Sequence, residues 1–133
     1  MTAANNLTGF TIMSYSGMQL MIVPKVKASF SLDNIDLTGI TSVNLIAAGD
    51  KPPQYGYTFE LHLDTPDGKK IGEIAVNSGL KLIMQGGFGS GMVSMNLEPV
   101  TDGKLHNLYL VSKATNAAEP NTFVLLAVQF KAK

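Results

Sequence analysis

The sequence predicts an all-β fold, either a sandwich or a barrel, and three observations support this. Apolar and polar residues alternate with a period of two in several segments, which is typical of strands with one buried face. Thirteen glycines and six prolines punctuate the chain, as turns between short strands require. No segment carries the sustained apolar stripe of a helix. We therefore expect about eight to ten strands and no helix longer than about two turns.

The first half of the chain contains four predicted strands. Residues 20–23 and 28–37 can form the first two, and residues 40–47 form the third, behind the turn Leu37-Thr38-Gly39. The fourth, at 57–63, has apolar side chains at every odd position and polar side chains at 58, 60 and 62. This alternation is that of a half-buried strand.

The second half continues the same pattern. Thr65-Pro66-Asp67-Gly68 has the composition of a tight turn, and residues 71–76 form the return strand. Residues 92–97 and 105–113 alternate again, and a turn containing Asp102-Gly103 separates them. The last predicted strand, at 123–130, is apolar on both faces, which is typical of a central strand that is covered on both sides.

The order of the strands predicts where the connections lie. If successive strands run antiparallel, the short turns at 38–40, 65–70 and 99–104 fall at one end of the sandwich. The longer connections at 24–28, 48–56, 77–91 and 114–121 then fall at the other end. Because binding sites tend to lie in long loops on a rigid scaffold, this second end is a candidate site. The alternative is that these loops only close the fold.

Composition excludes several classes of function. The 133 residues form a single domain, 1–133, which we expect to be excised from a larger protein. Ten lysines balance ten carboxylates and there is no arginine, so nucleic-acid binding is not expected. No apolar run approaches the roughly 18 residues of a membrane span, and no signal peptide is visible at the start. The absence of cysteine excludes disulfides and thiolate metal sites.

Catalytic and metal-binding motifs are also missing, so we do not expect an enzyme, a cofactor or a metal. His62 and His106 lie on different predicted strands without metal-ligand spacing, and each is expected to be an exposed strand residue. Gly89-Ser90-Gly91 is predicted to be a flexible loop rather than part of a nucleophile elbow. The four glutamates are scattered and single out no glycosidase pair.

From residue 29 to residue 130 the sequence resembles a known family. The segments that carry the resemblance are Asn34-Ile35-Asp36-Leu37-Thr38-Gly39-Ile40, residues 59–72 (FELHLDTPDGKKIG) and residues 106–113 (HNLYLVSK). They are similar to family 6 carbohydrate-binding modules. The chain looks most like the subgroup appended to secreted bacterial cytochrome-c-like, sugar-dehydrogenase-like or trehalose-utilisation-like proteins. The resemblance implies an antiparallel jelly-roll β-sandwich of the galactose-binding-like type.

The resemblance also implies two places for a sugar. In the family, aromatic rings and an asparagine bind a sugar among the loops at one end, and Phe88 stands near the position of the family's tryptophan. The loop-end candidates for a neutral polysaccharide or oligosaccharide are therefore Tyr55, Gln85, Phe88 and Asn121. A second family site lies on a concave sheet face, where the candidates are Glu60, His62, Asn107 and Tyr109. For these four residues the alternative is an ordinary solvated strand face.

The chain departs from the family's pattern at several site positions. Val124-Leu125-Leu126 replaces the asparagine and aspartate of the last strand, and Ser29 stands where many members have tryptophan. We therefore expect the family's calcium site to be empty, so that chelation leaves the melting temperature unchanged.

Two functions remain open. One is a noncatalytic module that targets a larger secreted protein to glycan outside the cell or in the periplasm. The other is a structural spacer that has lost the sugar cleft.

Overall fold

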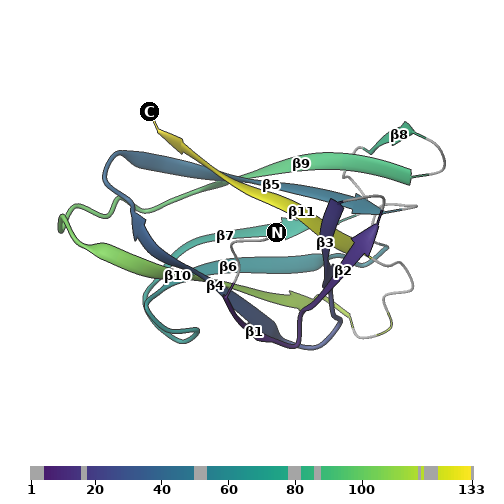
Figure 1. Cartoon of the computed structure of the whole chain (residues 1–133), viewed down its shortest axis with the longest axis horizontal. Helices are drawn as coiled ribbons and strands as arrows, with labels where there is room; N and C mark the ends of the chain where they lie inside the picture. Colours follow the sequence, from purple (N-terminus) through teal and green to yellow (C-terminus); the bar gives the residue numbers. More distant parts are fainter. Residues whose placement is uncertain are drawn as a thin grey trace.

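The chain folds into two antiparallel sheets that pack face to face, as the computed structural model in Figure 1 shows. The structure describes residues 5–15, 18–49, 54–77, 82–85, 88–116, 118 and 123–132. These residues form eleven strands and no helix, so no helix there is long and apolar enough to span a bilayer. The predicted all-β sandwich is confirmed.

Five strands form sheet A and six form sheet B. The order in sheet A is β1 (Asn5–Thr8), β4 (Ala28–Asp36), β10 (Leu105–Ala114), β6 (Tyr57–Leu63) and β7 (Lys70–Val76). The order in sheet B is β2 (Thr11–Tyr15), β3 (Met18–Val23), β11 (Phe123–Ala132), β5 (Ile40–Gly49), β9 (Phe88–Asn96) and β8 (Ile83–Gln85). The chain crosses repeatedly between the sheets, as a jelly roll requires.

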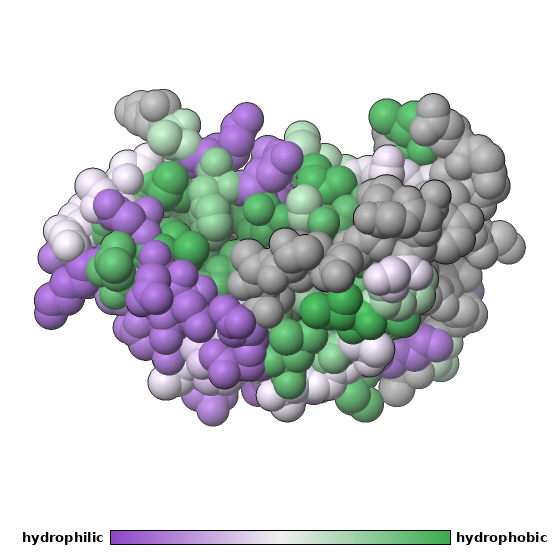
Figure 2. Space-filling view, viewed as in Figure 1, coloured by the Kyte–Doolittle hydropathy of each residue, from purple (hydrophilic) through white to green (hydrophobic). Residues whose placement is uncertain are grey.

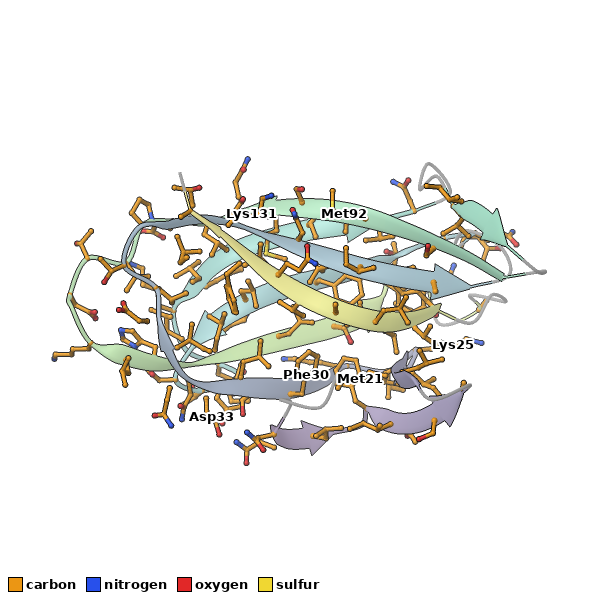
Figure 3. All side chains as sticks on the ribbon, turned by 45° about the horizontal axis from the view of Figure 1, so that its top comes forward. Met21, Lys25, Phe30, Asp33, Met92 and Lys131 are labelled. Carbon is orange, nitrogen blue, oxygen red and sulfur yellow. The ribbon has the colours of Figure 1, made fainter. Side chains whose placement is uncertain are left out.

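The core lies between the inner faces of the two sheets, because alternate side chains of each strand point into the same layer. Tyr57, Phe59 and Phe123 form an aromatic cluster there, with ring centroids 5.4 to 6.5 Å apart. In Figure 3, Phe30 and Met21 lie between the sheets, and both are fully buried. β11 lies between β3 and β5, which confirms the predicted central position. Only its first three residues, 123–125, are buried, so the prediction that the strand is covered on both sides along its length is wrong.

The two ends of the sandwich are the ones that the strand order predicts. At one end Asp36 is paired with Leu105 and His62 with Lys70, so the short turns gather there. At the other end β4, β7, β10 and β11 begin or finish beside the longer connections, and Gly49 is paired with Gly89. The predicted separation of short turns from long connections is therefore confirmed.

Three strands and one strand boundary differ from the prediction. The eleven strands exceed the expected eight to ten because β1, β2 and β8 have short sequences with little alternation. The segment 89–91 is not a flexible loop but part of β9, where Gly89 and Gly91 pair with Gly49 and Ala47. Glycine has a low strand propensity, but pairing along β5 provides the hydrogen bonds that hold this segment extended.

Candidate functional site

The outer face of sheet A carries a ladder of polar side chains on β6 and β10. Across these strands, Tyr109 lies opposite His62, Val111 opposite Glu60, and Lys113 opposite Thr58. Their neighbours in sequence, such as Leu110 and Leu61, point into the core. Because directly opposite residues of antiparallel strands share a face, β6 and β10 bring Glu60, His62 and Tyr109 together, as the concave-face prediction requires.

The β6–β7 turn at 64–69 folds back over part of this face. The His62 Nδ1 atom lies 2.8 Å from the Gly68 carbonyl oxygen, and its Nε2 atom lies 2.8 Å from the Glu60 Oε1 atom. The side chain of His62 is only 13% exposed. Both ring nitrogens are therefore used within the protein, and the prediction that His62 is an exposed strand residue is wrong.

Asn107 is also engaged within the protein. It follows an irregularity in the pairing of β10 with β4, and its Oδ1 atom accepts a hydrogen bond of 3.1 Å from the Asn34 backbone amide. Its backbone carbonyl accepts a hydrogen bond from the Asp64 amide at 2.7 Å. Asn107 thus connects β4 to the β6–β7 turn, and its amide oxygen already has a donor.

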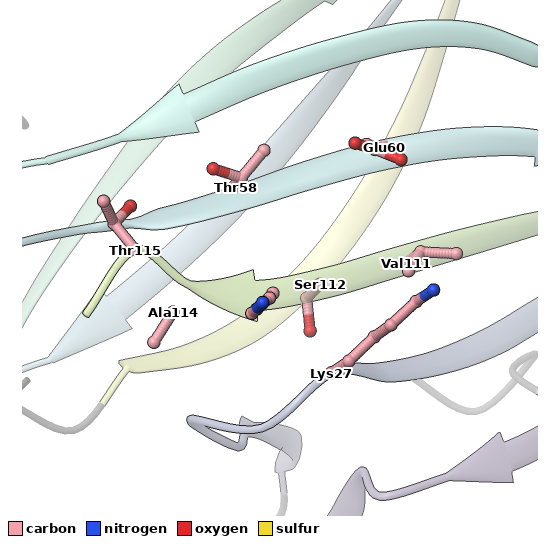
Figure 4. A pocket seen from close by; sticks show the side chains of 8 residues that line it. Lys27, Thr58, Glu60, Val111, Ser112, Ala114 and Thr115 are labelled. Carbon is pink, nitrogen blue, oxygen red and sulfur yellow. The ribbon is translucent and has the colours of Figure 1, made fainter. Parts of the chain in front are cut away.

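An open groove of about 470 Å³ lies on the same face, nearer to the long connections. Figure 4 shows Thr58 and Glu60 on β6, Val111 on β10, Thr115 just after β10, and Lys27 reaching in from the connection before β4. The groove is lined by Lys27, Thr58, Glu60, Val111, Ser112, Lys113, Ala114 and Thr115. Of the four concave-face candidates, Glu60 alone belongs to this lining.

The lining combines hydrogen-bonding groups with charge. Thr58 and Thr115 offer hydroxyls, Glu60 offers a carboxylate, and Lys27 and Lys113 offer ammonium groups. Such groups match the donors and acceptors of a polyhydroxylated ligand. No aromatic side chain is among the lining residues that the structure describes, and these residues offer hydrogen bonds and ionic contacts.

Sequence reasoning missed most of this lining. The alternation in residues 57–63 and 105–113 places Thr58 and Lys113 on the outward face with Glu60 and Tyr109, so the period of two could have found them. Lys27 gives no such signal, because it lies in a connection outside the strands and reaches the groove through its long side chain.

The loop-end candidates are placed only in part. Gln85 and Phe88 are paired across the β8–β9 connection at the end of the long loops, and their side chains lie outside the described residues. Tyr55 precedes β6 at the same end and is 43% exposed. Asn121 lies outside the described residues. The backbone thus places three candidates at one end, and a loop-end site stays a prediction.

At the short-turn end, His106 is buried between two carboxylates, so the prediction of an exposed residue is wrong. Its Nδ1 atom lies 3.0 Å from the Asp64 Oδ2 atom, and its Nε2 atom lies 2.8 Å from the Asp102 Oδ2 atom. The hydrogen bonds that the ring donates to the carboxylates of Asp64 and Asp102 raise the pKa of His106 above its usual range. We call His106, Asp64 and Asp102 the His106 clasp. It connects the start of β10 to two turns, because Asp64 follows β6 and Asp102 follows β9.

A pH titration tests the clasp. Since the pKa of His106 is raised on folding, its stabilisation is complete below the unfolded value of about 6.5 and is lost as pH rises through the folded pKa. The melting temperature of the wild type should exceed that of His106→Gln most at about pH 5.5, and the difference should shrink towards about pH 9. A difference that stays constant over this range contradicts the role of the clasp.

A polar network covers the edge of sheet A at β1 and β4. The fully buried Ser31 hydroxyl donates to the Asp33 Oδ1 atom at 2.7 Å and accepts from Asn6 Nδ2 at 2.8 Å, while Asn5 Nδ2 donates to Asp33. Figure 2 shows hydrophilic residues gathered over this part of the molecule. No group of three or more His, Asp or Glu side chains that could hold a metal occurs in the described ranges.

Comparison with known proteins gives matches of structure and none of sequence. Neither the protein-family models nor the curated protein sequences contain a match to this chain. A family 6 carbohydrate-binding module from Clostridium cellulolyticum in complex with xylose has a TM-score of 0.72 and 20% identity, over 98% of this chain and 92% of that one. CsCBM6-3 from Clostridium stercorarium, in complex with cellobiose, has a TM-score of 0.66 and 17% identity, over 98% and 86%.

A larger protein matches in part. A glycoside hydrolase family 43 arabinoxylan arabinofuranohydrolase from Bacillus subtilis, in complex with cellotetraose, has a TM-score of 0.66 and 21% identity. The match covers 91% of this chain and only 23% of that one. Identities this low establish the fold alone, because function depends on the site. The fold is that of the family 6 modules, and the predicted jelly-roll sandwich is confirmed.

Proposed function

We propose that this chain is a noncatalytic carbohydrate-binding module that attaches a larger secreted bacterial protein to glycan, outside the cell or in the periplasm. The observation that carries the proposal is the groove on the outer face of sheet A, in a fold shared with modules that were solved with bound sugars. A lining of hydroxyls, one carboxylate and two ammonium groups suits the hydroxyls of a sugar.

In this proposal the strands hold the binding groups in place before the sugar arrives. Glu60 is fixed by its 2.8 Å contact with His62, and Thr58 lies opposite Lys113 in a regular ladder. Preorganised groups lose little freedom on binding, which favours affinity. The groove is open, however, and its described lining residues include no aromatic ring, so we expect a Kd between about 1 mM and tens of micromolar, equivalent to roughly −4 to −6 kcal/mol.

The loop end is the second location that we propose for a sugar. Tyr55 and Phe88 would provide rings for the C–H face of a neutral sugar, and Gln85 and Asn121 would provide amides for its hydroxyls. Two observations support this location. Gln85 and Phe88 are paired at the end of the sandwich that carries the long connections, and Tyr55 is exposed.

Titration of neutral oligosaccharides, followed by backbone amide shifts, tests the proposal. Shifts at Thr58, Glu60 and Lys113 would support the groove if the affinity measured from them falls severalfold in Glu60→Gln. This substitution removes the charge but keeps a hydrogen-bond partner for His62. Glu98→Gln is the matched control, since Glu98 is exposed and lies outside the lining. Shifts confined to Tyr55 and Phe88 would move the site to the loop end. If no glycan shifts any resonance at tens of millimolar, the spacer function replaces the proposal.

A further inference from the structure

Two lysines at the groove are available to an acidic ligand. Lys113 is exposed on β10, and no carboxylate of the described residues forms an ion pair with it. Lys27 contacts Asp67, but the distance is 3.9 Å and the two side chains are 65% and 91% exposed. A charge-assisted hydrogen bond is usually about 2.7–2.9 Å long, so this pair is weak and open to exchange.

The carboxylates near the groove already have partners. Glu60 lies 2.8 Å from the His62 Nε2 atom, and Glu73, opposite Glu60 on β7, accepts from the Lys70 ammonium at 2.6 Å. The hydrogen bond to Glu73 and the charge of Glu73, with a smaller contribution from the charge of Glu60, raise the pKa of Lys70. Glu60 and Glu73 thus have hydrogen-bond partners within the sheet, whereas Lys27 contacts only the exposed Asp67 among the described carboxylates and Lys113 contacts none of them.

The shape and chemistry of the lining favour a charged sugar over a neutral one. Neutral sugars in open sites gain much of their affinity by stacking a C–H face on an aromatic ring. Here the apolar side chain that the outer face adds to the described lining is the aliphatic Val111, since Ala114 belongs to the core. A ligand that adds ionic contacts to its hydrogen bonds would compensate for the missing ring.

We infer that the groove selects glycans that carry carboxylates, such as chains of uronic acid, and that Lys27 and Lys113 contact the sugar carboxylate. The inference rests on the proposed carbohydrate-binding function and names its ligand class. This ligand differs from the neutral glycan expected at the loop end, because the described residues that line the groove include two cations and no aromatic ring. Glu60 and the threonine hydroxyls of the groove then accept and donate hydrogen bonds to the remaining sugar hydroxyls.

The weak pair between Lys27 and Asp67 makes the β6–β7 turn a competitor of the ligand. Asp67 lies at the tip of the turn that folds over the outer face, and its carboxylate contacts the same ammonium that the sugar carboxylate would contact. Asp67→Asn removes this competition and a nearby negative charge. It should therefore tighten binding of an acidic glycan, whereas loss of either lysine should weaken it.

A matched pair of trisaccharides tests the inference. Cellotriose and the β-1,4-linked trimer of glucuronic acid share a backbone and differ at C6, where the second carries carboxylates. By calorimetry at about 20 mM salt, the acidic trimer should bind about tenfold more tightly, and this preference should fall to about twofold at about 0.5 M salt. Lys27→Met and Lys113→Met should each reduce the preference about threefold, and Asp67→Asn should raise it about twofold.

Lys131→Met is the control for a change of net charge, because Lys131 is exposed on β11 in the other sheet (Figure 3), and it should leave the preference unchanged. If cellotriose binds as tightly as the acidic trimer, or if the lysine variants keep the full preference, the inference is wrong and the proposed function stands. If neither trisaccharide nor any other glycan binds, both are wrong. Tighter, salt-sensitive binding of the acidic trimer that depends on both lysines supports the inference.

Discussion

Replacing Phe59 with alanine is expected to lower the free energy of unfolding by about 3–5 kcal/mol. Phe59 lies on β6 with none of its surface exposed, and its ring centroid is 6.1 Å from that of Phe123 on the opposite sheet. The substitution removes a large buried apolar surface and leaves a cavity that the two rigid sheets cannot close. Urea denaturation measures the loss as a lower transition midpoint at an unchanged slope.

Leu105→Ala is the matched control for the loss of a large apolar side chain. Leu105 is 61% exposed at the start of β10, so its truncation should change the free energy of unfolding by no more than about 0.5 kcal/mol. If Phe59→Ala costs less than about 1 kcal/mol, the two sheets do not meet through the aromatic cluster in the way described.

Gly68→Ala should cost about 3 kcal/mol or more and should also disturb the outer face of sheet A. An added Cβ would collide with the Leu63 carbonyl oxygen, which is backbone and cannot rotate away. The β6–β7 turn would have to open, and the Gly68 carbonyl would move away from the His62 ring. Thermal unfolding measures the cost, and the ring resonances of His62 report the lost contact.

Gly103→Ala is the control for Gly68→Ala, because it adds a Cβ to a glycine in a different turn. Gly103 has a φ of +70°, but a Cβ there meets no atom within 4 Å, so only the strain of the left-handed conformation remains, about 1–2 kcal/mol. The His62 resonances should not change in this variant. Equal costs for the two glycines would show that the tight packing of the turn against Leu63 is absent.

The His106 clasp and the Gly68 turn both position the β6–β7 connection. Asp64 at the start of this connection contacts His106, and Gly68 at its end contacts His62. These contacts therefore hold the connection in one position across the outer face, where the Asp67 carboxylate contacts the Lys27 ammonium. A change at the short-turn end can in this way alter the groove that begins farther along the same strands.

The sequence alone determined the fold class and most of the strands. Alternation with a period of two identified residues 57–63 and 105–113, because a sheet with one buried face requires it wherever the strand is long enough. The apolar run at 123–130 predicted a central strand, and β11 occupies that position. Turn residues and strand order then predicted which connections share an end. These features are local, or follow from local features by simple geometry.

Only the tertiary structure decided the short strands and the site. β1, β2 and β8 form because neighbouring strands offer hydrogen bonds, and the sequence of so short an edge strand carries little pattern. The burial of His62 and His106 depends on carboxylates and carbonyls from turns that return to the strands, with Asp64 lying 42 residues from His106. The groove likewise joins Lys27 to residues 58–60 and 111–115. Such contacts arise from register and from the path of turns, which depend on the whole sandwich rather than on any one segment.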